Sequence, residues 1–513
     1  MTTNRHGHIT RPAAPRHARP FAGGPPPAAL VVEAPPLKAL RPGDVGRLVV
    51  VFFFLGWSVL RALLVGMARR GARNPVETAC HGLVDGFIHL GPTFVKAGQI
   101  IASSGPLFPT VLATAARRCL DAVPPFPTEQ VRATIEDDLG APVQELFSFF
   151  DDVPLSAASI GQVHACTLSD GRQAVVKVQR PRIAEQMARD LRNGYRLAWL
   201  VEKTPWGRTS GARDIIRDVH AVTFEELNPA REAWQQDRFR RNIGAFGDNS
   251  LITAPEVYWD YCGPRVICME RVYGVPMDDF GRLATMGIDA QLILRWGAKV
   301  WAEAVMVHGP FHGDMHAGNV WALHDGRGCY LDFGIMGELE DDWKQVLKDL
   351  FYTCCFDLDF TRVAAAYRRV GVFPPGAGSD EEIGAFLNSI LGPILRAGYS
   401  SVNIGQLVTQ SLDLLKAFDA VAPRQLVLIA KQLLYIDRYA RHLAPDYTLT
   451  ADPLIVKNIF PAEAAAKAAE LGVPLDDVGT ALVEPNSAAP NGAGPNGAEP
   501  DGKAARNSRS ALR

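Results

Sequence analysis

Residues 312–319 read His312-Gly313-Asp314-Met315-His316-Ala317-Gly318-Asn319, so that an aspartate precedes an asparagine by five residues. Phosphoryl transfer uses these two residue types at this spacing. The carboxylate orients or deprotonates the attacking hydroxyl group, and the amide oxygen ligates magnesium. The motif therefore predicts Asp314 as a catalytic residue and Asn319 as a magnesium ligand.

A second motif, Asp332-Phe333-Gly334, begins thirteen residues after Asn319 and follows an apolar run at 329–331. Its carboxylate is expected to bridge the metal and the phosphates, which makes Asp332 the second predicted magnesium ligand. Either motif alone could be an ordinary polar loop, but both in this order are typical of a kinase. His312 and His316 lie four residues apart on a loop with no evident third ligand, so we interpret them as structural rather than as a zinc site.

A lysine closes the apolar strand Ala174-Val175-Val176-Lys177. Its ammonium group must either reach solvent or find an anion. In kinases that anion is the α/β-phosphate pair of ATP, and a glutamate on a helix holds the lysine in place. We choose Glu232 as this helix glutamate, with Glu225 and Glu226 as competitors that the sequence does not exclude.

The segment before this strand occupies the place of the loop that covers the phosphates. Small residues allow backbone N–H groups to approach phosphate, and alanine and serine here predict a stiffer loop than a glycine-rich one. Farther on, Met269 and Glu270 end a strand where a linker between two lobes would offer backbone groups to adenine. The predicted nucleotide contacts are Lys177, Met269, Glu270 and the loop residues Ala157, Ala158, Ser159, Ile160, Gly161, Gln162 and Val163.

The order of the predicted elements indicates an α+β, two-lobed, protein-kinase-like fold with an N-terminal helical extension and a helix-rich C-lobe. A hairpin is predicted over 163–178, short strands at 257–259, 265–269, 320–321 and 329–331, and helices over most of 340–480. No period of 20–50 residues repeats, which excludes a solenoid. The predicted parts are a disordered basic tail at 1–40, an apolar helix at 41–72, a helical extension at 73–150, an N-lobe at 151–275, a C-lobe at 276–484 and a disordered tail at 485–513.

Composition narrows the class of protein. The 513 residues are 47% hydrophobic and carry a formal net charge of −2. Without a basic stripe we expect no nucleic-acid partner. The eight cysteines form no C-x-x-C pair, which argues against zinc and against a disulfide framework and favours the reducing cytoplasm.

The most apolar stretch, residues 48–68, is long enough to span a bilayer but contains Arg61. A mid-membrane arginine costs roughly 2.5–3.5 kcal/mol on insertion scales, which the surrounding residues could offset. A single span would also export the basic N-terminal tail, which the flanking arginines do not favour. We therefore expect a buried or interfacial helix that contacts the inner face of the membrane, with a true span as the second choice.

These motifs together resemble the AarF/UbiB atypical kinase-like family over about residues 75–450. The family's K-x-G-Q motif matches Lys96-Ala97-Gly98-Gln99, in which Lys96 and Gln99 share one helix face. Its alanine-rich loop, its lysine strand, its H-x-D-x-H-x-G-N loop and its C-terminal helix with an L-x-P-D ending match in the same order. The resemblance implies that the K-x-G-Q helix covers the nucleotide site, with Lys96 as a catalytic or regulatory contact and Gln99 as a nucleotide contact.

The resemblance also implies ATP or ADP with Mg²⁺ as cofactors, and a role in quinone or isoprenoid-lipid metabolism as a lipid-responsive ATPase or small-molecule kinase. A hydrophobic small molecule or lipid is the expected partner, and a homodimer is a further hypothesis. No long activation segment follows Asp332, which disfavours protein substrates. Asn228 stands where the family has an aspartate, which keeps open the alternative of a nucleotide-gated scaffold, a pseudokinase. An antibiotic phosphotransferase is the third hypothesis, disfavoured by the K-x-G-Q helix.

Overall fold

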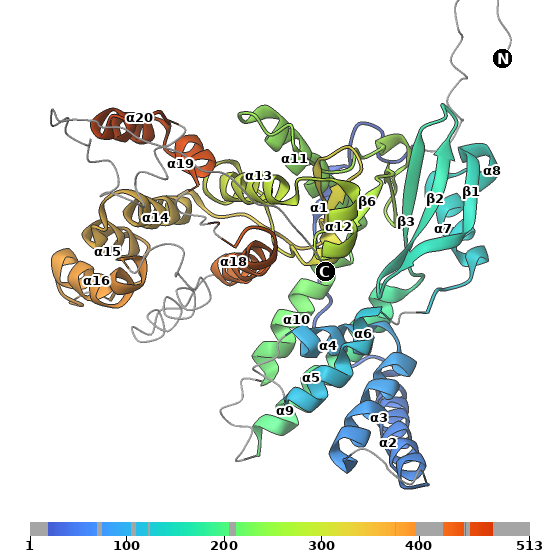
Figure 1. Ribbon diagram of the computed structural model, residues 1–513. Helices are drawn as coiled ribbons and strands as arrows, with labels where there is room; N and C mark the ends of the chain where they lie inside the picture. Colours follow the sequence, from blue (N-terminus) through green and yellow to red (C-terminus); the bar gives the residue numbers. More distant parts are fainter. Residues whose placement is uncertain are drawn as a thin grey trace, which may run out of the picture.

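The structure is a computed structural model that describes residues 19–68, 74–103, 109–121, 124–204, 212–374, 376–396, 424–445, 447 and 452–475. A β-sheet lobe and a larger helical lobe lie side by side, and a group of helices extends away from both (Figure 1). The predicted α+β, two-lobed class is therefore confirmed. The first part, residues 1–18, of the tail predicted at 1–40 and the whole tail predicted at 485–513 lie outside the described residues.

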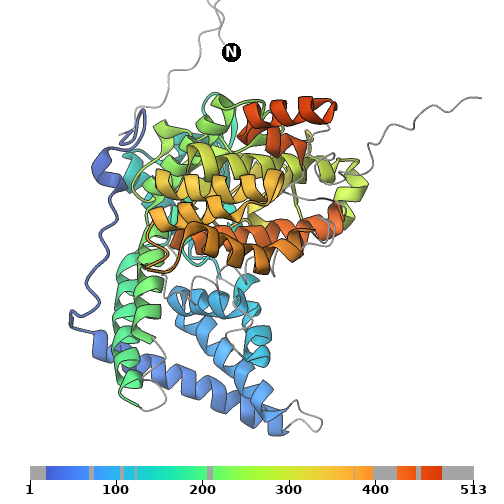
Figure 2. The same cartoon turned by 90° about the vertical axis from the view of Figure 1, so that its left-hand side faces the viewer.

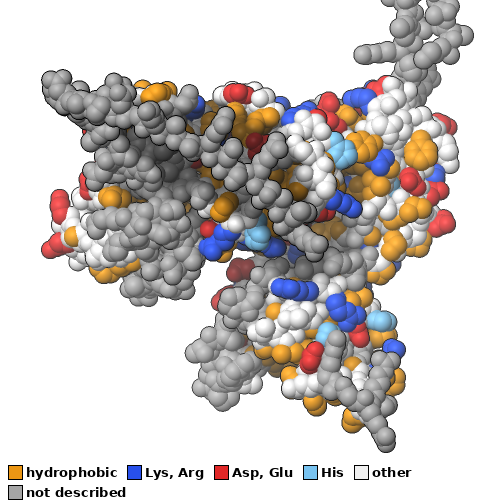
Figure 3. All heavy atoms as spheres, in the orientation of Figure 1, with side chains coloured by type: hydrophobic (Ala, Val, Ile, Leu, Met, Phe, Trp, Pro, Cys, Tyr) orange, Lys and Arg blue, Asp and Glu red, His pale blue; other side chains and the backbone are white. Residues whose placement is uncertain are grey.

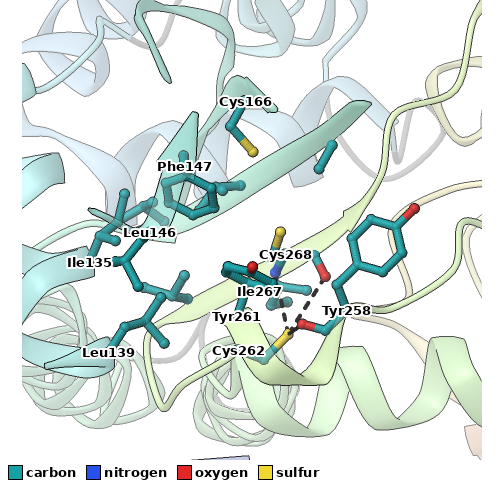
Figure 4. Packing of buried hydrophobic residues seen from close by; sticks show 14 of the residues in the cluster. Ile135, Leu139, Leu146, Phe147, Cys166, Tyr258, Tyr261, Cys262, Ile267 and Cys268 are labelled. Atoms are coloured by element: carbon teal, nitrogen blue, oxygen red, sulfur yellow. Dashed lines mark hydrogen bonds between the residues drawn. The ribbon is translucent and has the colours of Figure 1, made fainter. Parts of the chain in front are cut away.

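The smaller lobe is built on a four-stranded antiparallel sheet in the order β1-β2-β3-β5. The sheet packs its apolar face on helix α7, and Ile135 and Leu139 of α7 meet Phe147 and Ile267 in one buried cluster (Figure 4). The elements are α7 (Thr128–Leu139), α8 (Val143–Leu146), β1 (Phe147–Ala157), β2 (Gly161–Leu168), β3 (Gln173–Gln179) and β5 (Val266–Glu270), with α11 (Pro229–Ala245) beside the sheet.

The predicted hairpin is confirmed, since Val163 of β2 pairs with Lys177 of β3. Strand β1 is not predicted, because its burial does not alternate and the register shifts along its pairing with β2. The strand predicted at 257–259 is wrong. Val257 makes a single bridge to Met269, and residues Trp259–Tyr261 form the 3-10 helix η2.

The larger lobe surrounds a second four-stranded sheet in the order β4-β9-β8-β6. Its core joins α13, α18 and α19 around Trp301, Phe311, Phe333 and Ile436. The strands are β4 (Ile252–Thr253), β6 (Gly274–Pro276), β8 (Val320–Leu323), β9 (Gly328–Tyr330) and the pair β7 (Phe311–His312) with β10 (Met336–Gly337). The helices are α12 (Phe280–Met286), α13 (Ala290–Glu303), η3 (Ala304–His308), η4 (Ala317–Asn319), α14 (Asp341–Tyr352), η5 (Thr353–Asp357), α15 (Phe360–Arg369), α16 (Asp380–Arg396), α18 (Arg424–Leu443), α19 (Pro453–Ile459) and α20 (Pro461–Leu471).

The helical extension begins with a long hairpin of two helices. Helix α2 lies tightly along α3, because an added Cβ on Gly82 would come within 2.7 Å of the Ala62 Cβ, and one on Gly86 within 2.9 Å of the Leu55 Cδ2. The extension comprises α2 (Asp44–Ala68), α3 (Pro75–Leu90), α4 (Pro92–Ser103), α5 (Thr110–Ala116) and α6 (Arg118–Asp121), packed on α9 (Ile183–Glu202), which leads into α10 (Ala212–Glu226). Within the part of the chain that the structure describes, one helix, Asp44–Met67, is long and apolar enough to cross a membrane, and 6% of its most apolar window is buried.

Residues 19–43 correct the prediction of a disordered tail up to residue 40. This segment runs along the outside of the body to the start of α2 (Figure 2). Phe21 is buried in the N-lobe core, and the short helix α1 (Pro27–Leu30) contacts α11. The Ala29 carbonyl accepts a hydrogen bond from the Asn228 side chain at 2.9 Å. These tertiary contacts cannot be read from composition, on which the prediction of disorder rests.

Candidate active site

The site begins with the lysine at the middle of the N-lobe sheet. Lys177 lies on β3, whose apolar neighbours are buried on the opposite face, so that its side chain points toward α11. Its Nζ donates to the Glu232 Oε1 at 2.6 Å and lies 3.6 Å from the Asp332 Oδ2. Glu232 sits in the first turn of α11, which the Asn228 side chain caps by accepting from the Arg231 N–H. Of the carboxylates considered in the sequence, the structure brings Glu232 to Lys177.

The charges of this group shift one another's pKa values. Burial opposes the ammonium form of Lys177, but the carboxylates of Asp332 and Glu232 outweigh it and raise the pKa of the lysine. Burial raises the pKa of Glu232 to about 7, against the pull of Lys177. Lys177 in turn lowers the pKa of Asp332. At neutral pH the site therefore presents a fixed cation and an ionised carboxylate, as binding of a metal–phosphate complex requires.

The catalytic loop is shaped by His312, which is completely buried. Its Nδ1 accepts a hydrogen bond from the Asp314 N–H at 3.1 Å, and its Nε2 donates to the carbonyl groups of Leu331 and Asp332. Burial lowers the pKa of His312, which keeps the ring in this neutral form. The histidine thus ties the Asp314 loop to the Asp332 loop, and the structural role predicted for it fits these contacts.

Asn319 and Asp332 have the chemistry of a magnesium site. The Asn319 Nδ2 donates to the Asp314 carbonyl at 3.0 Å, which leaves its amide oxygen for a cation. Asp332 has a left-handed backbone with φ of 55°, and its Oδ1 accepts the Gly334 N–H at 3.2 Å. Among the described residues no group of three or more His, Cys, Asp or Glu side chains forms a metal cluster. One carboxylate and one amide suit Mg²⁺ that completes its shell with phosphate oxygens and water.

The alanine-rich segment forms the tight turn between β1 and β2. The Ala158 N–H donates to the Gly161 carbonyl, and the Ile160 carbonyl accepts from the Arg180 N–H, each at 2.8 Å. Gly161 has no space for a side chain, because a Cβ would lie 2.5 Å from the Val178 carbonyl oxygen. These bonds hold the turn of Ala158, Ser159 and Ile160 on the sheet, while the other predicted loop residues, Ala157, Gly161, Gln162 and Val163, lie in the ends of β1 and β2.

Gln162 and the predicted adenine contacts are already engaged. The Gln162 side chain is buried and donates to the Phe126 carbonyl at 2.9 Å, so it anchors the start of α7 instead of facing a ligand. The Glu270 N–H donates to the Glu256 carbonyl at 2.8 Å, and Met269 lies within the sheet. Any backbone donor to adenine must come from a residue other than Glu270.

The K-x-G-Q helix, α4, reaches the site through Lys96. Lys96 forms an ion pair with Glu226. Glu226 in turn lies next to Gly334 in the Asp332 loop, because its Cγ would be 3.7 Å from a Cβ added to that glycine. Gln99 points the other way and donates to the Cys119 carbonyl at 3.1 Å. The structure thus places Lys96 beside the Asp332 loop, whereas it gives Gln99 a helix-packing contact.

Two residues that contact the Asp314 loop of the candidate site were missed by the sequence analysis. Lys431 of α18 donates to the Asp314 Oδ1 at 2.7 Å. Its neighbour Gln432, fully buried, accepts from the Met315 N–H at 2.7 Å and donates to the Gly313 carbonyl at 2.6 Å. The available signal was a polar Lys-Gln pair interrupting an apolar helix at 426–436, which requires polar partners.

Comparison with known proteins gives two family-model matches. The ABC1 atypical kinase-like domain matches residues 118–367, and the UbiB helical domain matches residues 387–448. The "Uncharacterized protein Rv0647c" of Mycobacterium tuberculosis is 34% identical over 402 residues, covering 78% of this chain and 82% of that one. The "Probable protein kinase UbiB" of Marinobacter nauticus is 35% identical over 375 residues, covering 71% of this chain and 67% of that one. The solved complex of Rv3197 with erythromycin from M. tuberculosis is similar at a TM-score of 0.43 and 23% identity, covering 71% of this chain and 90% of that one.

Proposed function

The chain belongs to the ABC1/UbiB family of atypical kinase-like proteins, and on this premise we propose that it is an ATP- or ADP-binding, Mg²⁺-dependent ATPase or small-molecule or lipid kinase. The observation that carries the proposal is the convergence of Lys177, Glu232 and Asp332, which lie 155 residues apart in sequence at their extremes and form one ion-paired group. A lysine held between two acidic side chains is the arrangement that binds the phosphates of ATP.

Each residue then has a defined task. Lys177 contacts the α/β-phosphates and Glu232 holds its ammonium group in place. Asp332 and Asn319 ligate the magnesium ion, which supplies charge neutralisation at the phosphates when bound. Asp314 accepts the proton of the attacking hydroxyl group or water. The ion pair of Lys96 and Glu226 lies at the edge of this group, where α4 limits access to it.

A small or lipid-like phosphate acceptor suits the surface better than a protein. Only β10 (Met336–Gly337) and a short loop separate Gly334 from α14 at Asp341, so there is no long segment on which a polypeptide could dock. The exposed apolar helix α2 supports a peripheral contact with the inner face of the cytoplasmic membrane, where quinones and isoprenoid lipids partition. A link to quinone or isoprenoid-lipid metabolism is part of the proposal.

The test is phosphate release from ATP by purified protein with Mg²⁺, with and without liposomes and hydrophobic phenols. We expect turnover that anionic lipid increases, and a loss of about 100-fold or more in Asp332→Asn because the metal loses its carboxylate. Asp341→Asn is the matched control, since Asp341 is 97% exposed at the start of α14. Absence of turnover by the wild type under all these conditions would refute the enzymatic function. Thermal stabilisation by nucleotide without turnover would instead support a pseudokinase scaffold.

Lys96 offers an independent check of the same site. Lys96→Ala removes the cation that pairs with Glu226 beside the Asp332 loop, so we expect an altered preference between ATP and ADP. The measurement is the dissociation constant of each nucleotide by calorimetry, compared with Lys467→Ala, which removes a surface lysine paired only within α20. An unchanged ratio of the two dissociation constants would remove Lys96 from the nucleotide site.

A further inference from the structure

Helix α18 forms hydrogen bonds with the catalytic loop on both sides of Asp314. The Gln432 side chain accepts a hydrogen bond from the N–H group of Met315, which follows Asp314, and donates one to the carbonyl group of Gly313, which precedes Asp314. About two turns farther along α18, the Tyr439 hydroxyl group donates to the Met315 carbonyl at 2.9 Å. The backbone that carries Asp314 is therefore fixed by a helix more than a hundred residues later in the chain.

The same helix also supplies the nearest cation to the Asp314 carboxylate. The Lys431 Nζ lies 2.7 Å from the Asp314 Oδ1, and the two side chains are 41% and 21% exposed. Although burial works against the charged form, the Asp314 carboxylate raises the pKa of Lys431. On the opposite oxygen, the His316 Nε2 is 3.8 Å from the Asp314 Oδ2. Lys431 thus binds one oxygen of the carboxylate, and the other oxygen faces the His316 ring without a hydrogen bond to it.

We propose that Lys431 is a positioning residue for the phosphoryl-transfer step, and that it acts by fixing the Asp314 carboxylate toward the attacking group. The inference rests on the proposed function. It also assigns a task to the helical domain, since α18 lies within the residues matched to it. That domain completes the catalytic loop by supplying one cation to its side chain and one amide to its backbone.

The chemistry explains why the loop requires such a residue. A general base contributes only when its oxygen lies within hydrogen-bond reach of the proton that it accepts, and a displacement of about 1 Å can cost about 100-fold in rate. An aspartate at the entrance of a site that also holds phosphates would otherwise be repelled by them. The Lys431 ammonium group offsets that repulsion while the carboxylate keeps its second oxygen for the acceptor.

The experiment is a double-mutant cycle in the full chain, measured as kcat and KM for ATP. We expect Lys431→Met to lower kcat by about 10- to 100-fold, with KM within about twofold, because the nucleotide contacts are left intact. Lys431→Arg should restore most of the lost rate, since it returns the cation. In an Asp314→Asn background, Lys431→Met should cost no further rate, because its partner has already lost its charge. Arg441→Met, which breaks the ion pair with Asp437 on the same helix, is the matched control.

The outcomes separate this inference from the proposed function. Turnover by the wild type together with an unchanged kcat in Lys431→Met would overturn the inference alone. So would additive losses in the double variant, which would mean that Lys431 acts without Asp314. No turnover by the wild type overturns both. The unfolding midpoint of each variant shows whether a drop in kcat comes from misfolding. If Lys431→Met is misfolded, Lys431→Arg, which keeps the charge, is the variant whose kcat tests the inference.

Discussion

Gly98 shows how closely one residue controls the helix that carries Lys96. A Cβ at this position would lie 2.4 Å from the Cys119 Sγ, so α4 and α6 touch through backbone and sulfur. We therefore expect Gly98→Ala to reduce the free energy of unfolding by about 1–3 kcal/mol, as for other overpacked sites. Chemical denaturation measures this change.

The control for that substitution is another helical glycine. Gly244 in α11 has open space around its Cβ position, so Gly244→Ala should be neutral or stabilise by up to about 1 kcal/mol. In the double variant Gly98→Ala with Cys119→Ala, removal of the sulfur should recover part of the loss. Equal effects of the two glycine substitutions would show that packing against Cys119 does not limit α4.

At this scale the sequence identifies residues whose spacing is fixed by chemistry. Asp314 and Asn319 lie on one loop, so their separation along the chain reports their separation in space. Lys177 and Glu232 require a fold to meet, but each stands in a recognisable local setting, the end of an apolar strand and the first turn of a helix. For Lys431 the sequence offers only the polar pair that interrupts an apolar helix. Its partner lies 117 residues away, and no local spacing encodes that contact.

Among the elements, the start of α2 is the point where the apolar hairpin joins the body. Asp44 is completely buried, and Arg192 donates to its two oxygens at 2.7 and 3.0 Å. The hydrogen bonds from Arg192 lower the pKa of Asp44 well below its ordinary value of 3.8. Since the folded pKa is depressed, the carboxylate contributes stability above pH 3.8 and loses it as the pH falls toward the folded value.

We accordingly predict that Asp44→Asn reduces the free energy of unfolding by about 3 kcal/mol at pH 7, because it leaves a buried arginine without its counter-charge. The difference from the wild type should shrink as the pH falls below about 4, because the Asp44 carboxylate of the unfolded chain begins to protonate there while the folded one stays ionised. Urea denaturation at pH 7 and at pH 3 measures it. Asp214→Asn, which breaks an exposed pair with Arg217, should change little at either pH. A difference for Asp44→Asn that does not depend on pH would exclude its charge as the cause.

The elements that the sequence failed to predict share a physical reason. A regular spacing of hydrophobic residues indicates an element that buries one face, so the sequence predicts β3 and α18. It does not find β1, because ten of its eleven residues are exposed or half-buried without alternation. It also does not find the segment at 19–43, which is held by single contacts such as the buried Phe21. Where tertiary contacts rather than pattern stabilise a segment, composition alone misleads.

On the scale of the whole molecule, the apolar surface of α2 lies at the end of the extension, away from the C-lobe helices (Figures 1 and 3). Phe53 is 63% exposed and Trp57 53% exposed on this helix. Because α2 is packed along α3 and its base is anchored to α9 by Asp44, a membrane that takes up this surface would lie next to the helices that hold Lys96. If α2 binds lipid as proposed, the packing of α2 on α3 and α9 would link that binding to the helices near the proposed nucleotide site, which is why stimulation by lipid is expected.

The decisive measurement for this arrangement is partition onto vesicles of phosphatidylcholine with and without phosphatidylglycerol. We expect wild-type binding that is stronger with the anionic lipid, since Arg69, Arg70 and Arg73 follow α2 in the sequence. Phe53→Glu with Trp57→Glu should weaken binding at least about tenfold, because each aromatic side chain contributes about 1.5–3 kcal/mol when buried. Phe149→Glu, an equally exposed aromatic position on β1, is the control and should bind as the wild type does.

Carbonate at high pH then separates the two modes of contact, since it releases a helix that lies on the surface and leaves a spanning helix in the membrane. Retention after carbonate would reverse the interfacial assignment, and equal binding by the double variant would remove α2 from the membrane contact altogether.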